Sequence, residues 1–294
     1  MRHYRVIQGE KATFPIATLC RVLEVGRSGY YAWARRGVSV RVQSDAVLTA
    51  QIAAAHARSR RTYGAPRVHA ELRAGGVRCA RKRVARLMRA AGLVGCHRRR
   101  RVRTTVAEPT HTPAPNLVAR DCTAPAADRL WIGASTFVPT GEGWLYRAVL
   151  LDAHSRRVVG WAMADYLRTE LTLDALAMAL GRPRPAAGLV HHTDRGGQYT
   201  AMAYQSRLFA RGITCSLSRA GECLDNAMAE SFFATLKAEI ADAGTWPTRA
   251  AARTAIFEWL EVWYNRQRRH SALAYRTPVA HEEQHVLLLQ DLAA

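Results

Sequence analysis

The spacing of apolar residues along the chain changes near residue 126. Before this point apolar residues recur at intervals of three and four, which is typical of helices with one buried face. After it, three runs rich in β-branched and aromatic residues follow one another, at 129–139, 144–155 and 156–164. The links between them are short and carry turn residues such as Thr-Gly-Glu-Gly, which predicts an antiparallel meander. The sequence therefore predicts a helical front and a rear that opens with a sheet.

The rear half then alternates between helix and strand patterns. Helices are expected over 167–180, 201–211 and 227–240, with short strands over 188–194 and 214–218. This order, βββαβαβα, predicts an α/β fold with a mixed sheet and helices on its faces. Polar residues at strand ends and helix starts converge on one edge of such a sheet, where Asp194 ends a strand and Glu230 begins a helix. Two carboxylates so placed can hold a divalent metal, although each alone is better explained as a cap or a surface group.

The front half is expected to be all-helical and segmented. Leu19, Val22 and Leu23 form one apolar stripe, Gly26 interrupts it and Ser28 is a candidate cap for a following helix. This pattern fits a helix-turn-helix or a simple αα-hairpin. Further helices are expected from about 45 to 58 and on both sides of Gly75-Gly76. The helix after Gly75-Gly76 carries five basic residues around its polar side, which is typical of a helix that faces DNA or of a solvated charged face. These residues are Arg81, Lys82, Arg83, Arg86 and Arg89.

The positive charge of the chain is concentrated in its front half. The formal net charge is +20, and residues 1–120 hold 25 Lys and Arg against 5 Asp and Glu, while the remainder is balanced. Most of this excess is arginine, whose planar guanidinium matches phosphate geometry, so nucleic acid is the favoured partner over a mere solubility device. A run that cannot build a core, comprising Arg98, Arg99, Arg100 and Arg101, is expected to lie along phosphates.

Other classes of protein are disfavoured by what the sequence lacks. Six cysteines are scattered without a Cys-x-x-Cys pair, so neither a zinc site nor a disulfide framework is expected. No apolar run reaches the length that spans a bilayer, and the first residues do not form a signal sequence. A cytoplasmic, nucleoid-associated protein without membrane contact is expected.

Several motifs, in order, resemble the bacterial insertion-sequence transposases that have a retroviral-integrase-like catalytic core. HHTDRGGQY and ECLDNAMAESFFATLK carry Asp194 and Glu230 with 35 residues between them, which is the spacing of the family's last two acids. Lys237, seven residues after Glu230, matches the family's basic residue. TYGAPRVHAEL and KRVARLMRAAGL resemble the helical region before the core, LYRAVLLDAHSRRVVGWAM its second and third strands, and EVWYNRQRRHSALAYRTP its C-terminal signature. The resemblance covers nearly the whole chain.

The resemblance implies a ribonuclease-H-like core in which three acids bind two magnesium ions, with manganese as a substitute. Such enzymes cut DNA at the terminal inverted repeats of their element and join the freed ends to target DNA, as a homodimer or a higher oligomer. Phosphate contacts are implied for Lys237, Arg268 and Arg269. The expected domains are a helix-turn-helix-like segment (1–40), a helical DNA-binding module (44–96), an Arg-rich linker (97–125), the catalytic core (126–245) and a C-terminal helical tail (246–294).

One position departs from the family's pattern. The family writes the first strand as Trp, two residues, Asp, one residue, Thr and an aromatic, and here Trp131 is followed by Ala134, Thr136 and Phe137. Ala134 therefore stands where the first catalytic acid belongs, and a methyl group cannot bind a metal. Neither Asp128 nor Asp152 is expected to replace it. Because the rest of the site still fits, the pattern favours deliberate inactivation over gradual decay.

Two further hypotheses remain beside the transposase. The chain could be a non-enzymatic DNA-binding protein derived from a transposase, such as a repressor that occupies the element's ends, or a structure-specific nuclease with the same core. The flanking motifs argue against the nuclease. The two histidines His191 and His192 are expected to hydrogen-bond and shape the site. Asn226 is expected to cap a helix, with holding the preceding loop or touching DNA near the metals as alternatives. An aromatic group is expected to pack in a core or an interface: Trp259, Trp263 and Tyr264.

Overall fold

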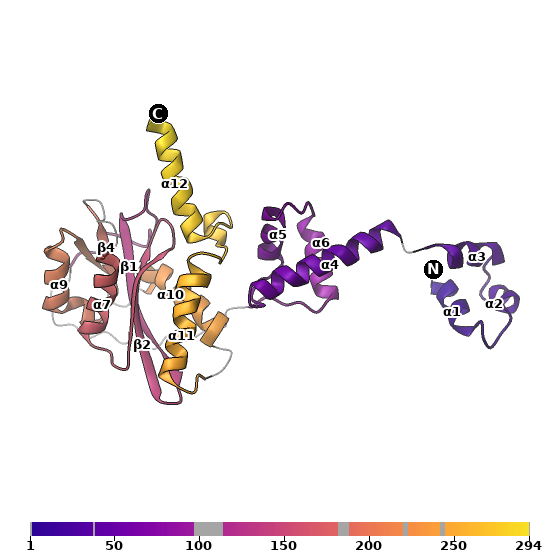
Figure 1. Cartoon of the computed structure of the whole chain (residues 1–294), viewed down its shortest axis with the longest axis horizontal. Coiled ribbons are helices and arrows are strands. Elements are labelled where there is room, and N and C mark those ends of the chain that lie inside the picture. The colour runs from indigo at the N-terminus through magenta and orange to yellow at the C-terminus, as the bar shows by residue number, and fades with distance from the viewer. Residues whose placement is uncertain are drawn as a thin grey trace.

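A computed structural model describes residues 2–37, 39–96, 114–181, 188–219, 223–241 and 245–293. Figure 1 shows three bodies along the long axis of the chain: a small group of helices at the N-terminal end, a second group that contains α4, α5 and α6, and a larger body built around a sheet. The C-terminal helix α12 projects from this larger body. None of the helices in the described residues combines the length and the apolar content that a bilayer crossing needs.

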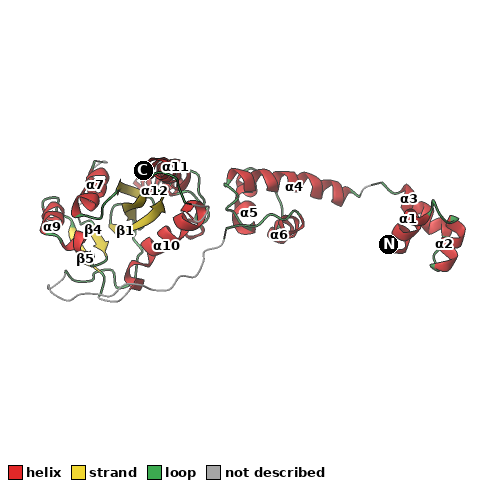
Figure 2. Cartoon of the chain, turned by 90° about the horizontal axis from the view of Figure 1, so that it is seen from below, coloured by secondary structure: helices red, strands yellow, loops and turns green. Residues whose placement is uncertain are grey.

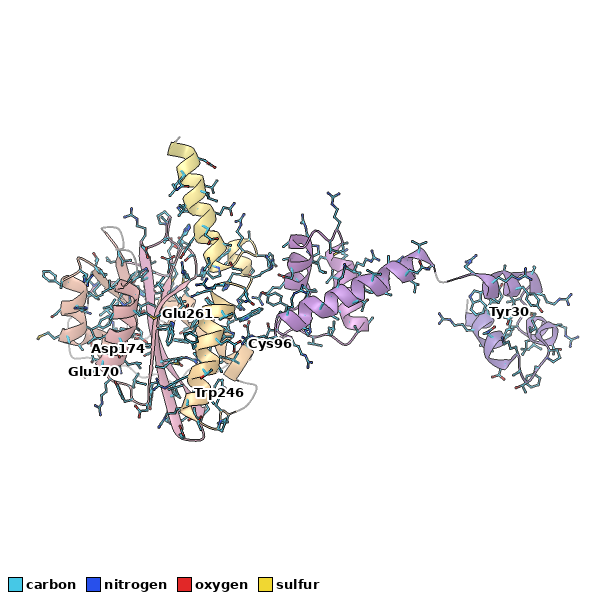
Figure 3. All side chains as sticks on the ribbon, in the orientation of Figure 1. Tyr30, Cys96, Glu170, Asp174, Trp246 and Glu261 are labelled. Carbon is cyan, nitrogen blue, oxygen red and sulfur yellow. The ribbon has the colours of Figure 1, made fainter. Side chains whose placement is uncertain are left out.

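The first body is a three-helix cluster with a small core of its own. It consists of α1 (Arg2–Glu10), α2 (Ile16–Val22) and α3 (Arg27–Arg35). Ile7, Cys20 and Tyr30 are buried between these helices, and Tyr30 lies at the far end of the chain in Figure 3. The α1 helix was not expected from the sequence. The expected cap at Ser28 is wrong, because α3 begins at Arg27 and Ser28 lies inside its first turn.

The second body is a three-helix module formed by α4 (Val40–Arg58), α5 (Ala65–Ala74) and α6 (Arg81–Ala90). Ser39 caps α4 by accepting a hydrogen bond from the main-chain N–H of Val42, 3.3 Å away. One apolar stripe of each helix is buried at the centre, as the periodicity predicts. These buried residues are Leu48, Ile52, Val68, Leu72, Val84, Leu87 and Met88.

The sheet of the third body has five strands in the order β3-β2-β1-β4-β5. The strands are β1 (Leu130–Thr140), β2 (Gly143–Asp152), β3 (Val158–Ala164), β4 (Val190–Thr193) and β5 (Thr214–Leu217). The first three form an antiparallel meander, while β4 pairs parallel to both β1 and β5. The mixed sheet expected from the sequence is confirmed.

Helices cover both faces of this sheet. One face packs against α7 (Thr169–Leu180) and α9 (Met202–Phe209), which follows the short α8 (Gly197–Thr200). Gly160 of β3 allows α7 to approach closely, because a Cβ there would lie 2.2 Å from the carbonyl oxygen of Ala175. The other face packs against α10 (Ala227–Leu236), which follows the 3₁₀ turn η1 (Cys223–Asn226), and against α11 (Arg249–Glu258).

The first part of the segment after residue 246, through residue 264, packs into this core. The α11 helix continues into a π-helical segment, η3 (Trp259–Tyr264), whose aromatic residues are buried, so the packing role predicted for Trp259, Trp263 and Tyr264 is confirmed. Both indole N–H groups donate to Glu239, in the π-helical turn η2 (Lys237–Ala241) that ends α10. A 3₁₀ turn, η4 (Ser271–Leu273), and α12 (Pro278–Ala293) complete the chain.

Two arginines lie inside this body in opposite electrostatic situations. Arg268 is 4% exposed, and its guanidinium contacts Glu239 at 2.8 Å. Arg147 of β2 is 1% exposed, stands 5.5 Å over the ring of Phe233, and none of its three guanidinium nitrogens meets a hydrogen-bond acceptor in the described residues. Burial lowers the pKa of Arg147 to about 9. A buried charge without a counter-ion costs stability.

We therefore expect Arg147→Met to stabilise the folded protein, by roughly 1–4 kcal/mol, because it removes an unpaired buried charge and keeps similar volume. Arg268→Met is the matched control. It should destabilise the protein by about 3–5 kcal/mol, since it leaves the Glu239 carboxylate buried without its counter-ion. Chemical denaturation of the two variants measures both effects. A loss of stability in both would contradict this account of Arg147.

The gain from Arg147→Met should also depend on pH. Since the pKa of Arg147 in the folded state is below that of the unfolded chain, the unfolded state binds more protons between these two values. The stability of the parent chain therefore rises as pH increases above about 9. We expect the advantage of the variant to be constant at lower pH and to shrink above that value, as measured by denaturation at several alkaline pH values.

Candidate active site

The parallel pairing of β1 with β4 brings positions 134 and 194 to the same end of the sheet. Ile132 is paired with His192 in this ladder. Ala134 lies two residues beyond Ile132, and Asp194 lies two residues beyond His192, directly after β4 ends. Side chains two residues apart along a strand point to the same face. The position named from the sequence as the first acid therefore lies on β1, and the position of the second directly follows the adjacent strand β4, at the same end of the sheet.

The helix that carries Glu230 is tied to the same part of β1. The side-chain amide of Asn226, at the N-terminus of α10, donates to the carbonyl oxygen of Gly133 over 3.2 Å. Glu230 is exposed and lies one turn further along the helix. The ammonium group of Lys237 lies 5.9 Å from the ring of Phe137, further along β1. The α10 helix thus runs beside β1 from Gly133 onward, and Figure 2 shows the two next to each other.

Asn226 ties the start of α10 to the sheet. It occupies the cap position of α10, but its side chain makes no capping hydrogen bond. The capping role is therefore wrong, and the bond to Gly133 gives it the role of fixing the start of the helix on the sheet. The neighbouring Asp225 is buried and accepts hydrogen bonds from Arg219 and Asn116, which anchors the loop before the helix.

The electrostatics around Asp194 favour a cation. One carboxylate oxygen of Asp194 accepts a hydrogen bond from the main-chain N–H of Gly196, 3.0 Å away. Dehydration by surrounding protein raises the pKa of this carboxyl although the residue is exposed as a whole, and the Gly196 bond opposes that rise. A carboxylate with few compensating charges in such a position is a candidate for metal binding.

The two histidines beside Asp194 are structural, as predicted. His192 is hydrogen-bonded through both ring nitrogens, to the hydroxyls of Ser216 (2.8 Å) and Ser218 (3.0 Å). The Nε2 of His191 lies 2.8 Å from the hydroxyl of Tyr204 on the other face, and burial lowers the pKa of His191 to about 4. Both imidazoles are therefore engaged with protein partners.

The side chains present at this edge fit a smaller metal complement than the resemblance implies. Carboxylate oxygens are suitable ligands for magnesium, which is often held by one or two carboxylates together with water and phosphate oxygens. Asp194 and Glu230 fit that requirement, whereas the methyl group of Ala134 supplies no ligand. Within the described residues, no group of three or more His, Cys, Asp or Glu side chains is arranged to hold a metal. A two-ion centre thus does not fit the chain as written.

The α6 helix presents a basic surface, part of which is neutralised by another helix. Arg81 and Lys82 are exposed. Arg83 and Arg86 form ion pairs with Asp45 of α4, at 2.7 and 2.6 Å, and these two arginines lower the pKa of the Asp45 carboxyl. An open hollow of about 690 Å³ lies between the starts of α4 and α6. Its lining includes four basic side chains, those of Arg41, Lys82, Arg83 and Arg86.

The remaining basic residues named from the sequence differ in their placement. The phosphate contact expected of Arg268 does not fit the structure, because its guanidinium is buried against Glu239. Arg269 is partly buried and forms an ion pair with Glu71 of α5, so it is engaged within the protein. Arg98, Arg99, Arg100 and Arg101 lie outside the described residues.

Comparison with known proteins gives matches over most of the chain. Residues 124–223 and 211–278 match models described as "Integrase core domain", and residues 43–101 match an "HTH-like domain". A 31 kDa protein of insertion element IS600 from Shigella sonnei is 42% identical over 268 residues, which cover 91% of this chain and 98% of that protein. The transposase InsF for insertion sequence IS3A from Escherichia coli strain K12 is 39% identical, with coverages of 91% and 94%.

Among solved structures, a simian T-cell lymphotropic virus intasome in complex with a PP2A regulatory subunit aligns with a TM-score of 0.45 and 14% identity, over 79% of this chain and 74% of that chain. The sequence matches to the insertion-sequence proteins are much stronger and span both the helical front and the sheet. Integrase core domains of this kind are metal-dependent, and the helix-turn-helix-like module indicates DNA binding. The chain belongs to the IS3-type family of insertion-sequence transposases, DDE enzymes with an integrase core domain.

Proposed function

We propose that this chain is the DNA-recombining subunit of an insertion sequence, that its site consists of position 134, Asp194 and Glu230, and that it binds DNA but cuts it negligibly as written. The observations that support the proposal are the pairing of β1 with β4 and the hydrogen bond that ties the start of α10 to β1. Adjacent parallel strands bring residues 134 and 194 to one edge, and Asn226 fixes the helix of Glu230 to Gly133 beside them.

Each residue has a part in the reaction of the intact site. Asp194 and Glu230 provide carboxylate oxygens for magnesium, with manganese as a substitute. In a site with all three acids, a pair of such ions would supply activation of the attacking oxygen and charge stabilisation of the leaving oxygen. Lys237, near the end of α10, is placed to contact a phosphate close to the reacting bond. The acid at position 134 completes the ligand set.

Within the described residues, the two carboxylates considered as replacements for the missing acid are engaged elsewhere. Asp128 accepts a hydrogen bond from the indole N–H of Trp131 over 2.9 Å. Asp152 is buried, and its two oxygens accept from the main-chain N–H groups of Asp128 and Ser155, at 2.7 and 2.8 Å. Both carboxylates therefore stabilise the turns around the sheet. This supports inactivity of the chain with alanine at position 134.

The DNA substrates are the terminal inverted repeats of the element and the target DNA. The exposed residues of α6 and the basic hollow beside it suit phosphate binding, because neutralising phosphates releases counterions. Two ends must be held together for transposition, so a homodimer or a higher assembly acts on DNA at the nucleoid in the bacterial cytoplasm. The α1–α3 cluster has its own core and is the part best suited to reach the DNA of another subunit.

The alternative is a DNA-binding protein without enzymatic activity, such as a repressor of its own element. The lost ligand at position 134 favours it, and both proposals share the same DNA interface. They differ only in what happens when the acid is restored.

Restoring the acid should restore the chemistry. We expect Ala134→Asp to raise magnesium-dependent cleavage of DNA that contains the element's ends by more than about 100-fold, because loss of a direct ligand exceeds the typical cost of losing a supporting residue. Gel analysis of end-labelled duplexes with and without magnesium measures this. Ala134→Asn serves as the control of similar shape with a poor ligand. Equal cleavage by the unsubstituted chain would refute the assignment of position 134.

The α6 surface should dominate the salt dependence of DNA binding. We expect Arg81→Gln together with Lys82→Gln to weaken binding to all sequences alike and to reduce the slope of log K against log salt by about 2, roughly one per lost phosphate contact. The control replaces Arg207 and Arg211, which are exposed basic residues at the other side of the sheet body. Titrations at several salt concentrations compare the pairs, and a slope that changes equally in both would contradict the assignment.

A further inference from the structure

The α4–α6 module is joined to the sheet body by a contact between the turn before α5 and the segment after η3. Tyr63, in that turn, is only 2% exposed. Its ring lies 5.7 Å from the ring of Trp263, and its hydroxyl accepts a hydrogen bond from the main-chain N–H of Arg269 over 2.7 Å. Burial raises the pKa of this hydroxyl, so it stays protonated. Tyr63 thus inserts from one body into the other.

Arg269 and its neighbours close the contact around Tyr63. The guanidinium of Arg269 donates to Glu71 of α5 and to the carbonyl oxygen of Tyr275. In the opposite direction, Arg67 of α5 donates to the carbonyl oxygen of Arg269 over 3.1 Å. At the rim, Arg60 pairs with Glu258, and the Cys96 thiol lies 3.1 Å from the carbonyl oxygen of Ala238, where Figure 3 shows Cys96 between the two bodies. Several directional bonds therefore fix one orientation.

The same contact continues to the helix of Glu230. The indole N–H of Trp263, whose ring packs on Tyr63, donates to Glu239 over 3.1 Å. Glu239 lies in the π-helical turn that continues α10, and it also binds the buried guanidinium of Arg268. Burial would lower the pKa of Arg268, but the Glu239 carboxylate, together with Tyr264 and Tyr63, outweighs this and raises it. A chain of direct contacts thus links Tyr63 of the DNA-binding module to α10 through Trp263 and Glu239.

We propose that Tyr63 and Arg269 form a joint that holds the α4–α6 module in a fixed orientation on the core and so determines which phosphate reaches the active site once α6 is bound. Tyr63 and Arg269 are positioning residues and contact no reacting atom. The basic surface of α6 and the carboxylates at the sheet edge then move as one body. The α1–α3 cluster does not share this joint, because its buried residues pack only among themselves. The effect on cutting rests on the proposed function, whereas the effect on shape does not.

The test uses the full chain with Ala134→Asp and adds Tyr63→Phe, which removes the acceptor for the Arg269 N–H and leaves the ring in place. We expect binding to end DNA to stay within about twofold, since α6 is untouched. Cuts should spread from one phosphate to several, and the cleavage rate should fall by about 10- to 100-fold, the typical effect of misplacing reacting groups by about 1 Å. Small-angle X-ray scattering should show that the variant has a larger maximum dimension and a broader distribution of interatomic distances than its parent.

The matched control is Tyr30→Phe, which removes another buried tyrosine hydroxyl with a single partner, Gln8 at 2.7 Å, in the α1–α3 cluster. This variant should leave the position of the cut unchanged. A general loss of stability would also leave that position unchanged, so a shifted cut is specific to the joint. If Tyr63→Phe fails to fold, Glu71→Gln tests the same joint. Cutting at the unchanged phosphate by the joint variants overturns the proposal. If the Ala134→Asp chain does not cut at all, the proposed function fails, and an unchanged scattering profile would then still overturn the joint.

Discussion

The arrangement of the active edge depends on a short parallel ladder between β1 and β4. Only residues 130–132 of β1 pair with β4, yet this pairing fixes the register of everything that follows on both strands. A slip of β1 by one residue would turn Ala134 to the opposite face of the sheet. The buried residues Trp131 and Ile132, one on each face, hold that register because each side of the sheet has its own apolar core. The fold therefore specifies the site through packing on both faces, before any metal or DNA is bound.

Much of this fold could be predicted from the sequence, since alternation over 129–164 and helical spacing elsewhere report directly which faces are buried. The candidate site positions could be named from the sequence for another reason. The 35 residues between Asp194 and Glu230 are a motif spacing, and strand ends meet at one edge in sheets of this kind. Ion pairs between residues far apart in the sequence could not be predicted. Nothing local marks Asp45 as the partner of Arg83 and Arg86, or Glu239 as the partner of Arg268, because those contacts exist only after the helices have packed. The α1 helix was missed because the segment is short and its inward face carries few apolar residues, chiefly Tyr4 and Ile7.

The basic residues illustrate why a net charge of +20 is a coarse guide to function. Arg81 and Lys82 are exposed and suit phosphate contact, whereas Arg83 and Arg86 share one carboxylate. Arg268 and Arg269 lie in a motif whose sequence predicts a basic patch. However, Arg268 is buried against Glu239, and Arg269 forms an ion pair with Glu71 at the joint. A guanidinium makes up to five directional bonds, so it serves as readily inside an interface as on DNA. The burial of an arginine and its bonding partner, rather than its charge, decide whether it is available to DNA or holds the protein together.

The alanine at position 134 also shows how a functional acid conflicts with stability. Ala134 is buried in the apolar core that includes Ala229 and Phe232 of α10, and its methyl group is compatible with both strand and packing. An aspartate there would bring a third carboxylate to an edge where dehydration already raises the pKa of Asp194. Without a cation, such an acid would lower the stability of the folded protein, and functional sites commonly reduce stability in this way. An alanine at this position is therefore compatible with an intact surrounding framework.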